Sequence, residues 1–207
     1  MWITLIGMLA YGVLHTLLAG WFKPRFRARF GERAYYGLYR ILFNTIVTIT
    51  LAPVALAMLI EDSNAPVIWQ FPTRAEPVLM AIQLAGLAGM AVSLLQIDGM
   101  RFLGVTQLMA YLRGAPLPLA DEPLQTGGVY RLVRHPLYLF SILVMWPVTV
   151  MRGAYFGFCL GATLYFVVGS LYEERRLAQG FGQAYEDYRE RVAWLIPLVR
   201  LPRRASR

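Results

Sequence analysis

Two short stretches in the C-terminal third of the sequence place ionisable side chains directly beside apolar runs. Arg134 and His135 precede a run that carries no charge over the next sixteen positions, and Glu173 and Glu174 follow the next apolar run. Charge next to hydrocarbon costs free energy, so such groups indicate a functional site more often than chance placement would. We expect cations and carboxylates to meet at one rim of a membrane.

Tyrosines accompany these charges. Tyr185, Tyr188 and Val192 follow at i, i+3, i+7 spacing after a predicted break at Gly182. This spacing predicts a short amphipathic helix with one semi-apolar stripe, which we expect Pro197 to end. The helix could fold back over the mouth formed by the two charged stretches.

Such a rim would suit a zwitterionic ligand that carries an aromatic ring. Carboxylates can bind an ammonium or sulfonium group, Arg or His can bind a carboxylate, and tyrosines can stack on a nucleobase. S-adenosylmethionine has all these groups, and a nicotinamide dinucleotide matches them less well. The sequence has no GxGxxG after a strand, so neither cofactor would use a Rossmann site. No metal is expected, because His15, His135 and Cys159 lie in different parts of the sequence.

The composition explains where these groups are held. The chain has 207 residues, of which 57% are hydrophobic and 15% charged, which is too apolar for an ordinary soluble domain. Crossing a bilayer takes about 20 apolar residues as a helix. The expected spans are 2–22, 41–60, 77–97, Pro136–Met151 and Ala154–Tyr172, the last two joined as a tight hairpin at Arg152-Gly153. The predicted fold is therefore all-α, a polytopic membrane protein with about five transmembrane helices.

The basic residues predict the orientation of these spans. By position, 18 of the 20 Lys and Arg residues fall in the regions 23–40, 101–134 and 175–207. The positive-inside rule places these regions in the cytoplasm, with the N-terminus outside and the C-terminus inside. The net charge of +8 is thus explained by topology and anionic lipid rather than by nucleic acid.

We predict a single membrane domain over 1–207, with a three-span part (1–97), a cytoplasmic connection (98–135) and a catalytic hairpin with its tail (136–207). The connection begins with a mixed segment, 98–114, that could lie along the interface as a helix. Its remainder is rich in Pro and Gly and is expected to be a loop that leads into the charged motif. Asn44, Gln83 and Gln96 are expected to form interhelical hydrogen bonds.

The stretches "GGVYRLVRHPLY", "YEERRL" and "FGQAYEDYRERVAWLIP" resemble the isoprenylcysteine carboxyl methyltransferase superfamily, whose Arg-His-Pro and Glu-Glu elements are shared with the phospholipid methyltransferases. The likeness covers about residues 124–197. The N-terminal part, with "DGMRFLGVTQ", is similar to NnrU-like proteins and methanethiol S-methyltransferases. The resemblance implies that S-adenosylmethionine is held at the cytoplasmic end of the last hairpin. The implied cofactor-binding residues are Leu124, Gln125, Tyr130, His135, Pro136, Leu137, Tyr138, Glu173, Glu174, Tyr185 and Tyr188.

We expect three residues to act in catalysis. Arg134 would position the acceptor or the cofactor carboxylate, His135 would hydrogen-bond the cofactor or act as base, and Glu174 would orient the cofactor's cationic end. The last span, "LYFVVGSLY", lacks the arginine that prenylcysteine enzymes are expected to use for the substrate carboxylate. This favours a small thiol or a lipophilic acceptor that enters from the membrane.

Two other functions fit the same pattern. Some membrane sterol reductases resemble this C-terminal unit and use a reduced nicotinamide cofactor. An NnrU-like protein could also keep the scaffold as a non-catalytic membrane accessory factor. The sequence does not indicate the oligomeric state.

Overall fold

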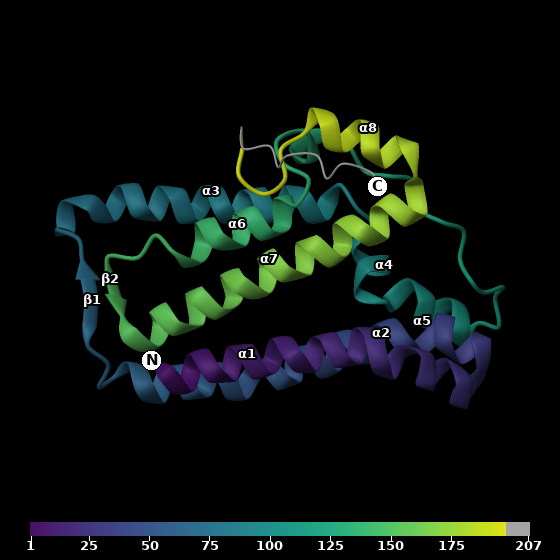
Figure 1. Ribbon diagram of the computed structural model, residues 1–207, viewed down its shortest axis with the longest axis horizontal. Coiled ribbons are helices and arrows are strands. Elements are labelled where there is room, and N and C mark those ends of the chain that lie inside the picture. Colours follow the sequence, from purple (N-terminus) through teal and green to yellow (C-terminus); the bar gives the residue numbers. More distant parts are fainter. Residues whose placement is uncertain (198–207) are drawn as a thin grey trace, which may run out of the picture. The chain divides into compact units, whose positions relative to one another are not determined.

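Helices dominate the computed structural model, which describes residues 1–197 (Figure 1). The helices are α1 (Trp2–Leu17), a π-helical turn (Leu18–Phe22), α2 (Lys23–Asp62), α3 (Glu76–Leu95), α4 (Gly99–Leu103), α5 (Val105–Leu112), α6 (Pro136–Met145), α7 (Gly153–Phe181) and α8 (Gln183–Arg191), with single 3-10 turns at Thr73–Ala75 and Gly128–Arg131. Two short strands, β1 (Val67–Gln70) and β2 (Val150–Arg152), complete the described elements. The chain forms two compact units, the first made of 1–70, 98–122 and 150–165, and the second of 71–97, 123–149 and 166–207.

The first unit is built on α1 and α2, which lie side by side and antiparallel (Figure 1). The reversal occurs at Gly31, where φ of 80° and ψ of 170° interrupt α2. A positive φ is accessible to glycine without a Cβ clash, so a glycine suits this position. At the other end of the pair, the Met1 amino group lies 2.5 Å from Glu61 Oε1 and closes the two limbs together.

Three helical stretches among the described residues are long and apolar enough to cross a membrane: Trp2–Asp62, Thr73–Leu95 and Gly153–Phe181. The first of them contains the reversal at Gly31, so it comprises two antiparallel limbs. Helix α6 has only ten residues, fewer than the roughly 20 that a straight crossing takes. The protein is an integral membrane protein, and the count of five spans stays a prediction.

The mostly helical structure agrees with the predicted all-α class, but the tight hairpin expected between Met151 and Ala154 is replaced by a longer connection that contains a strand. Helix α6 ends at Met145, not Met151, and β2 then pairs antiparallel with β1, with Trp69 opposite Met151. Pro147 disfavours helical geometry at the residue before it and cannot supply a helical N–H, which explains the early end. Both strands are too short for an alternation of apolar and polar residues to be recognised in the sequence beside long apolar runs.

The second unit is organised by close packing of α3 against α6 (Figure 1). Glycines on α3 allow this approach, because a Cβ on Gly89 would lie 2.4 Å from Phe140 Cδ1 and one on Gly86 would lie 2.9 Å from Val144 Cγ2. Gln83 Nε2 donates to the Val144 carbonyl at 3.1 Å, as expected of a hydrogen bond between helices. Small residues at such interfaces are typical of membrane helices.

The connection 98–135 agrees in outline with its prediction. Its first part forms α4 and α5, separated by Gly104 with a φ of 93°, and residues 115–127 have no helix or strand. Asn44 donates to the carbonyls of Phe102 and Leu103 at 3.1 and 2.8 Å, so it fixes the end of α4 to α2. The connection is therefore partly helical and partly irregular, and its last residues lead into the charged motif.

Candidate active site

The Arg-His-Pro motif lies on a short extended segment of the second unit, directly before α6. Val133 forms a parallel bridge with Ala193, and the Arg134 amide donates to the Ala193 carbonyl at 2.9 Å. Pro136 then occupies the first turn of α6, where its missing N–H costs no helical bond. These backbone contacts bring the motif against the segment that follows α8.

Arg134 is buried and saturated with hydrogen bonds. Its Nε and Nη2 donate to the two carboxylate oxygens of Glu174 at 2.8 and 2.9 Å, a bidentate ion pair. Its Nη1 donates to the carbonyls of Arg189 and Val192 at 3.1 and 2.6 Å. The side chains of Arg134 and Glu174 are 4% and 12% exposed. In this arrangement the guanidinium joins three segments of the second unit rather than facing a ligand.

His135 lies between the two carboxylates. Its Nε2 is 2.8 Å from Glu174 Oε1, and its Nδ1 is 3.4 Å from Glu173 Oε2. Carboxylates only accept hydrogen bonds, so Nε2 donates to Glu174, and the charged imidazole would also donate from Nδ1 to Glu173. Burial lowers the pKa of His135, but the hydrogen bonds and charges of the two glutamates outweigh it and raise that pKa above its ordinary value. The raised pKa favours the charged imidazole, which has no lone pair with which to accept a proton.

Helix α8 closes the cluster with two buried tyrosines. The Tyr185 hydroxyl donates to Glu174 Oε1 at 2.6 Å, and the Tyr188 hydroxyl donates to the Tyr130 carbonyl at 2.6 Å. Both rings pack in a buried group with Val192, against which Leu124 also lies. Burial raises the pKa of each of these tyrosines, and burial with the Glu173 charge raises the pKa of Tyr130 to about 12. The hydroxyls are therefore neutral donors at physiological pH.

Glu173 is the more open carboxylate of the pair. Its side chain is 33% exposed, against 12% for Glu174. Its Oε2 accepts from the Tyr138 hydroxyl at 3.3 Å, and its Oε1 lies 3.5 Å from the exposed guanidinium of Arg176. The ring of Tyr138 lies nearly parallel to the rings of His135 and Phe166, with centroids 5.7 and 5.2 Å away. A carboxylate and a flat aromatic surface thus lie next to each other in the second unit.

The loop before the motif is anchored by Gln96, at the C-terminal end of α3. Gln125 Nε2 donates to the Gln96 carbonyl at 2.7 Å, and the Val129 amide donates to Gln96 Oε1 at 3.1 Å. Gly128 has a φ of 56°, and a Cβ there would lie 1.6 Å from Gln96 Nε2. The expectation of an interhelical role for Gln96 is therefore corrected: it binds the loop, because α3 ends beside that loop.

Most of the predicted site residues thus meet in the second unit. The cluster contains Leu124, Tyr130, Arg134, His135, Tyr138, Glu173, Glu174, Tyr185 and Tyr188. Gln125 contacts Gln96 instead, and Pro136 is fully buried at the start of α6, next to the half-buried Leu137. Helix α8 ends at Arg191, earlier than the expected stop at Pro197, because Val192 enters the extended segment that bridges Val133.

Two contributors were not predicted from the sequence. Phe166 stacks on Tyr138, and the carbonyls of Arg189 and Val192 accept from Arg134. An aromatic residue in an apolar helix carries no distinguishing signal, and every residue has a carbonyl. Only the bend after α8 gives these two carbonyls their role.

The chemistry of the cluster is that of a preorganised charged site. Arg134 and Glu174 neutralise each other, Glu174 also contacts His135, and the Glu173 side chain is partly exposed. A fixed carboxylate beside an aromatic face can bind a cationic ligand without rearrangement, which is how preorganised sites favour charge. The cluster contains nucleophilic side chains only as neutral tyrosines, which favours binding and positioning over covalent catalysis.

Comparison with known proteins identifies relatives named as methyltransferases. The chain is 32% identical over 139 residues to methanethiol S-methyltransferase 2 of Bradyrhizobium diazoefficiens, covering 67% of the chain and 53% of that protein. It is 33% identical over 152 residues to the methanethiol S-methyltransferase of Mycobacterium tuberculosis, covering 72% and 62%. It is 27% identical over 196 residues to that of Pseudomonas deceptionensis, covering 92% and 70%. No solved structure matches the chain.

The matched regions span from about half to seven-tenths of the length of these relatives. The pattern that defines the phospholipid methyltransferases matches residues 80–184, which is just over half of the 207 residues and includes the Arg-His-Pro motif and the glutamate pair. The chain therefore belongs to the phospholipid methyltransferase family.

Proposed function

We propose that this protein is an S-adenosylmethionine-dependent membrane methyltransferase that acts on a small thiol or a lipophilic acceptor. The observation that carries the proposal is the cluster of Arg134, His135, Glu173 and Glu174, in which one carboxylate is locked and the other is partly open. Membership of a methyltransferase family supports the same reaction class.

The residues fit the proposed methyl donor. S-adenosylmethionine combines a sulfonium, an amino-acid end and a flat purine. Glu173 offers a partly exposed carboxylate to a cationic group, and the stacked rings of Tyr138 and Phe166 offer aromatic surface. When bound, the donor supplies a methyl group that is electrophilic because its sulfur is positively charged. We assign Glu173 and Tyr138 to donor binding.

Arg134 and Glu174 serve this site as positioning residues. Their ion pair and its backbone partners leave the guanidinium without an open face, so a direct contact with substrate is disfavoured. His135 fixes the relative positions of the two glutamates by donating to both. Correct orientation of donor and acceptor alone can lower the barrier to a displacement by several kcal/mol. Holding the site rigid is therefore a sufficient catalytic role for these residues.

The acceptor is proposed to be neutral and small, with a thiol as the first choice. The second half of α7 before Glu173 contains no cation that could bind a substrate carboxylate. Relatives that carry the name methanethiol S-methyltransferase support a thiol. The thiolate rather than the thiol is the nucleophile, so the thiol gives up its proton before or during the attack. The methyl-sulfur bond of the donor breaks as the new bond to the thiolate sulfur forms.

The site is proposed to face the cytoplasm, which is where a nucleotide-containing donor is available. This orientation rests on the concentration of 18 of 20 cations in the three regions named above. A lipophilic acceptor would enter sideways from the bilayer. An impermeant amine-reactive reagent applied to intact cells tests the orientation, because the single lysine, Lys23, would then be protected.

The experiment that tests the proposed function is calorimetric titration of the detergent-purified protein with S-adenosylhomocysteine and, separately, with NADPH. We expect saturable binding of S-adenosylhomocysteine, weakened at least tenfold in Glu173→Gln and unchanged in Glu76→Gln, an exposed carboxylate at the start of α3. Gas chromatography of dimethyl sulfide formed from methanethiol then tests the acceptor. Binding of NADPH alone would assign a reductase, and binding of neither would leave a non-catalytic protein; either result refutes the proposal.

A further inference from the structure

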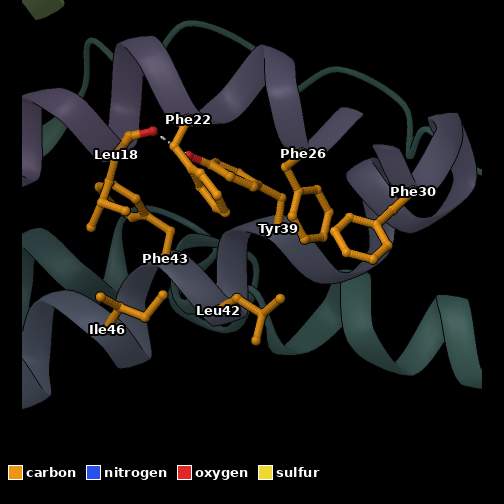
Figure 2. Close-up of a pocket in the computed structure, with 8 residues that line it drawn as sticks. All are labelled: Leu18, Phe22, Phe26, Phe30, Tyr39, Leu42, Phe43 and Ile46. Carbon is orange, nitrogen blue, oxygen red and sulfur yellow. Dashed lines mark hydrogen bonds between the residues drawn. The ribbon is translucent and has the colours of Figure 1, made fainter. Parts of the chain in front are cut away.

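An apolar pocket lies in the first unit, in the fork of the α1–α2 pair next to the reversal at Gly31. Figure 2 shows that its walls come from two lengths of chain, 18–30 and 39–46. The lining residues are Leu18, Phe22, Phe26, Phe30, Tyr39, Leu42, Phe43 and Ile46. The Tyr39 hydroxyl already donates to the Leu18 carbonyl, so the wall offers a ligand only hydrophobic surface.

The size and opening of this pocket favour a hydrocarbon chain. Its volume is about 230 Å³, below the roughly 300–1,000 Å³ of sites that enclose a whole soluble ligand. It is open at the surface, where Phe30 and Leu42 are 57% and 43% exposed. In a membrane protein, an open apolar pocket of this size accommodates part of one acyl chain.

Cations lie on the same stretch of α2 as the lining residues Phe26 and Phe30, and the Arg29 guanidinium is 5.6 Å from the centre of the Phe30 ring. Lys23, Arg25 and Arg29 are exposed on the N-terminal part of α2, and within residues 1–197 none of the three pairs with a carboxylate. The Arg25 guanidinium lies 3.7 Å from the centre of the Trp21 ring and donates to the Trp21 carbonyl. That contact uses one of five N–H donors, so the others are available to an anion.

From the pocket and the cations Lys23, Arg25 and Arg29 we propose that the first unit binds one anionic phospholipid. One acyl chain lies against Phe22, Phe26 and Leu42, and the phosphate headgroup is held by Arg25 and Arg29. The local charge favours an anionic over a zwitterionic lipid, because Lys23–Arg33 contains five cations and one carboxylate. A zwitterionic lipid would gain the apolar contact but little from this field. The residues belong to the first unit, so the inference does not depend on the proposed methyl transfer.

The test is native mass spectrometry of the detergent-purified chain titrated with phosphatidylglycerol or phosphatidylcholine of the same acyl chains. We expect phosphatidylglycerol to bind at least tenfold more tightly. Each cation near an anionic headgroup contributes about fivefold, so Arg25→Gln/Arg29→Gln should weaken phosphatidylglycerol binding by up to about 25-fold and so abolish the preference. The control Arg74→Gln/Arg113→Gln removes two other exposed cations and should retain the preference.

A second variant tests the acyl-chain pocket. Leu42→Trp adds bulk at a partly exposed wall position and should weaken both lipids, by about fourfold for each methylene displaced. Equal binding of the two lipids by the unmodified protein would overturn the proposal without any variant. An equal loss of preference in both double variants, or unchanged lipid binding in Leu42→Trp, would overturn it as well.

Discussion

The adjacent carboxylates of α7 should respond very differently to the same substitution. Glu174 accepts from Arg134 at 2.8 and 2.9 Å, from His135 at 2.8 Å and from Tyr185 at 2.6 Å. Glu174→Gln removes the charge and places an amide N–H₂ against groups that are themselves donors. Breaking a buried ion pair from one side costs about 3–5 kcal/mol, because the remaining charge stays buried.

Glu173→Gln should cost less than about 1 kcal/mol of stability. Its side chain is 33% exposed, and its contacts with His135, Tyr138 and Arg176 are 3.3–3.5 Å long. Partly exposed pairs at such distances are screened by water and contribute little. The effect of Glu173→Gln should therefore fall on donor binding and activity.

Thermal unfolding followed by circular dichroism in detergent checks the contrast. A cost of 3–5 kcal/mol corresponds to a Tm lower by about 6–20 °C for a chain of this size, while Glu173→Gln should shift Tm by less than about 4 °C. Arg134→Met combined with Glu174→Gln should recover part of the loss, since both buried charges are then gone. Equal shifts in the two single variants, or no recovery in the double variant, would refute the assignment of Glu174 to the scaffold.

Three further outcomes are expected. The pKa of His135 is raised in the folded protein, so the charged imidazole stabilises the fold fully below about pH 6.5. This stabilisation is lost as the pH rises through the raised pKa. The Tm should therefore fall more between pH 6 and 9 in the unmodified protein than in His135→Gln. Gly89→Ala should cost about 1–3 kcal/mol by urea or SDS titration, since its Cβ would lie 2.4 Å from Phe140, whereas Gly180→Ala, with no atom within 4 Å, should be neutral or stabilising. Cys159 is buried, so a maleimide should label it only at the rate of unfolding, and rapid labelling under native conditions would contradict the packing around it.

The sequence predicted the composition of the site better than its internal arrangement. Arg134, His135 and Glu174 were recognised because charge beside an apolar run is conspicuous, and the helical spacing predicted that Tyr185 and Tyr188 share the buried side of α8, whereas Val192 joins them from the extended segment after it. What each group contacts was not predictable, because those contacts depend on the bend after α8. That bend turns Arg134 toward the Arg189 and Val192 carbonyls.

The sequence likewise predicted which helices form better than it predicted the contacts and short elements between them. Apolar runs identified the long helices, whereas the small β1–β2 sheet was missed because three or four apolar residues look alike in strand and helix. The kink at Gly31 and the anchoring of the loop by Gln96 depend on backbone geometry and on distant partners. Neither leaves a periodic signal in a single sequence.

The two glutamates together explain why a charged motif can be tolerated at a membrane border. A lone Arg134 or Glu174 so close to hydrocarbon would be costly, but each neutralises the other, and the two glutamates favour the charged form of His135. The three charges sum to one positive unit, which Glu173 balances. A cationic ligand that approached Glu173 would weaken its hold on His135, so ligand binding and the protonation of His135 should be coupled. Proton release measured on titration with S-adenosylmethionine, whose sulfonium gives it a net positive charge, in two buffers of different ionisation enthalpy tests this coupling, and identical heats in both buffers would refute it.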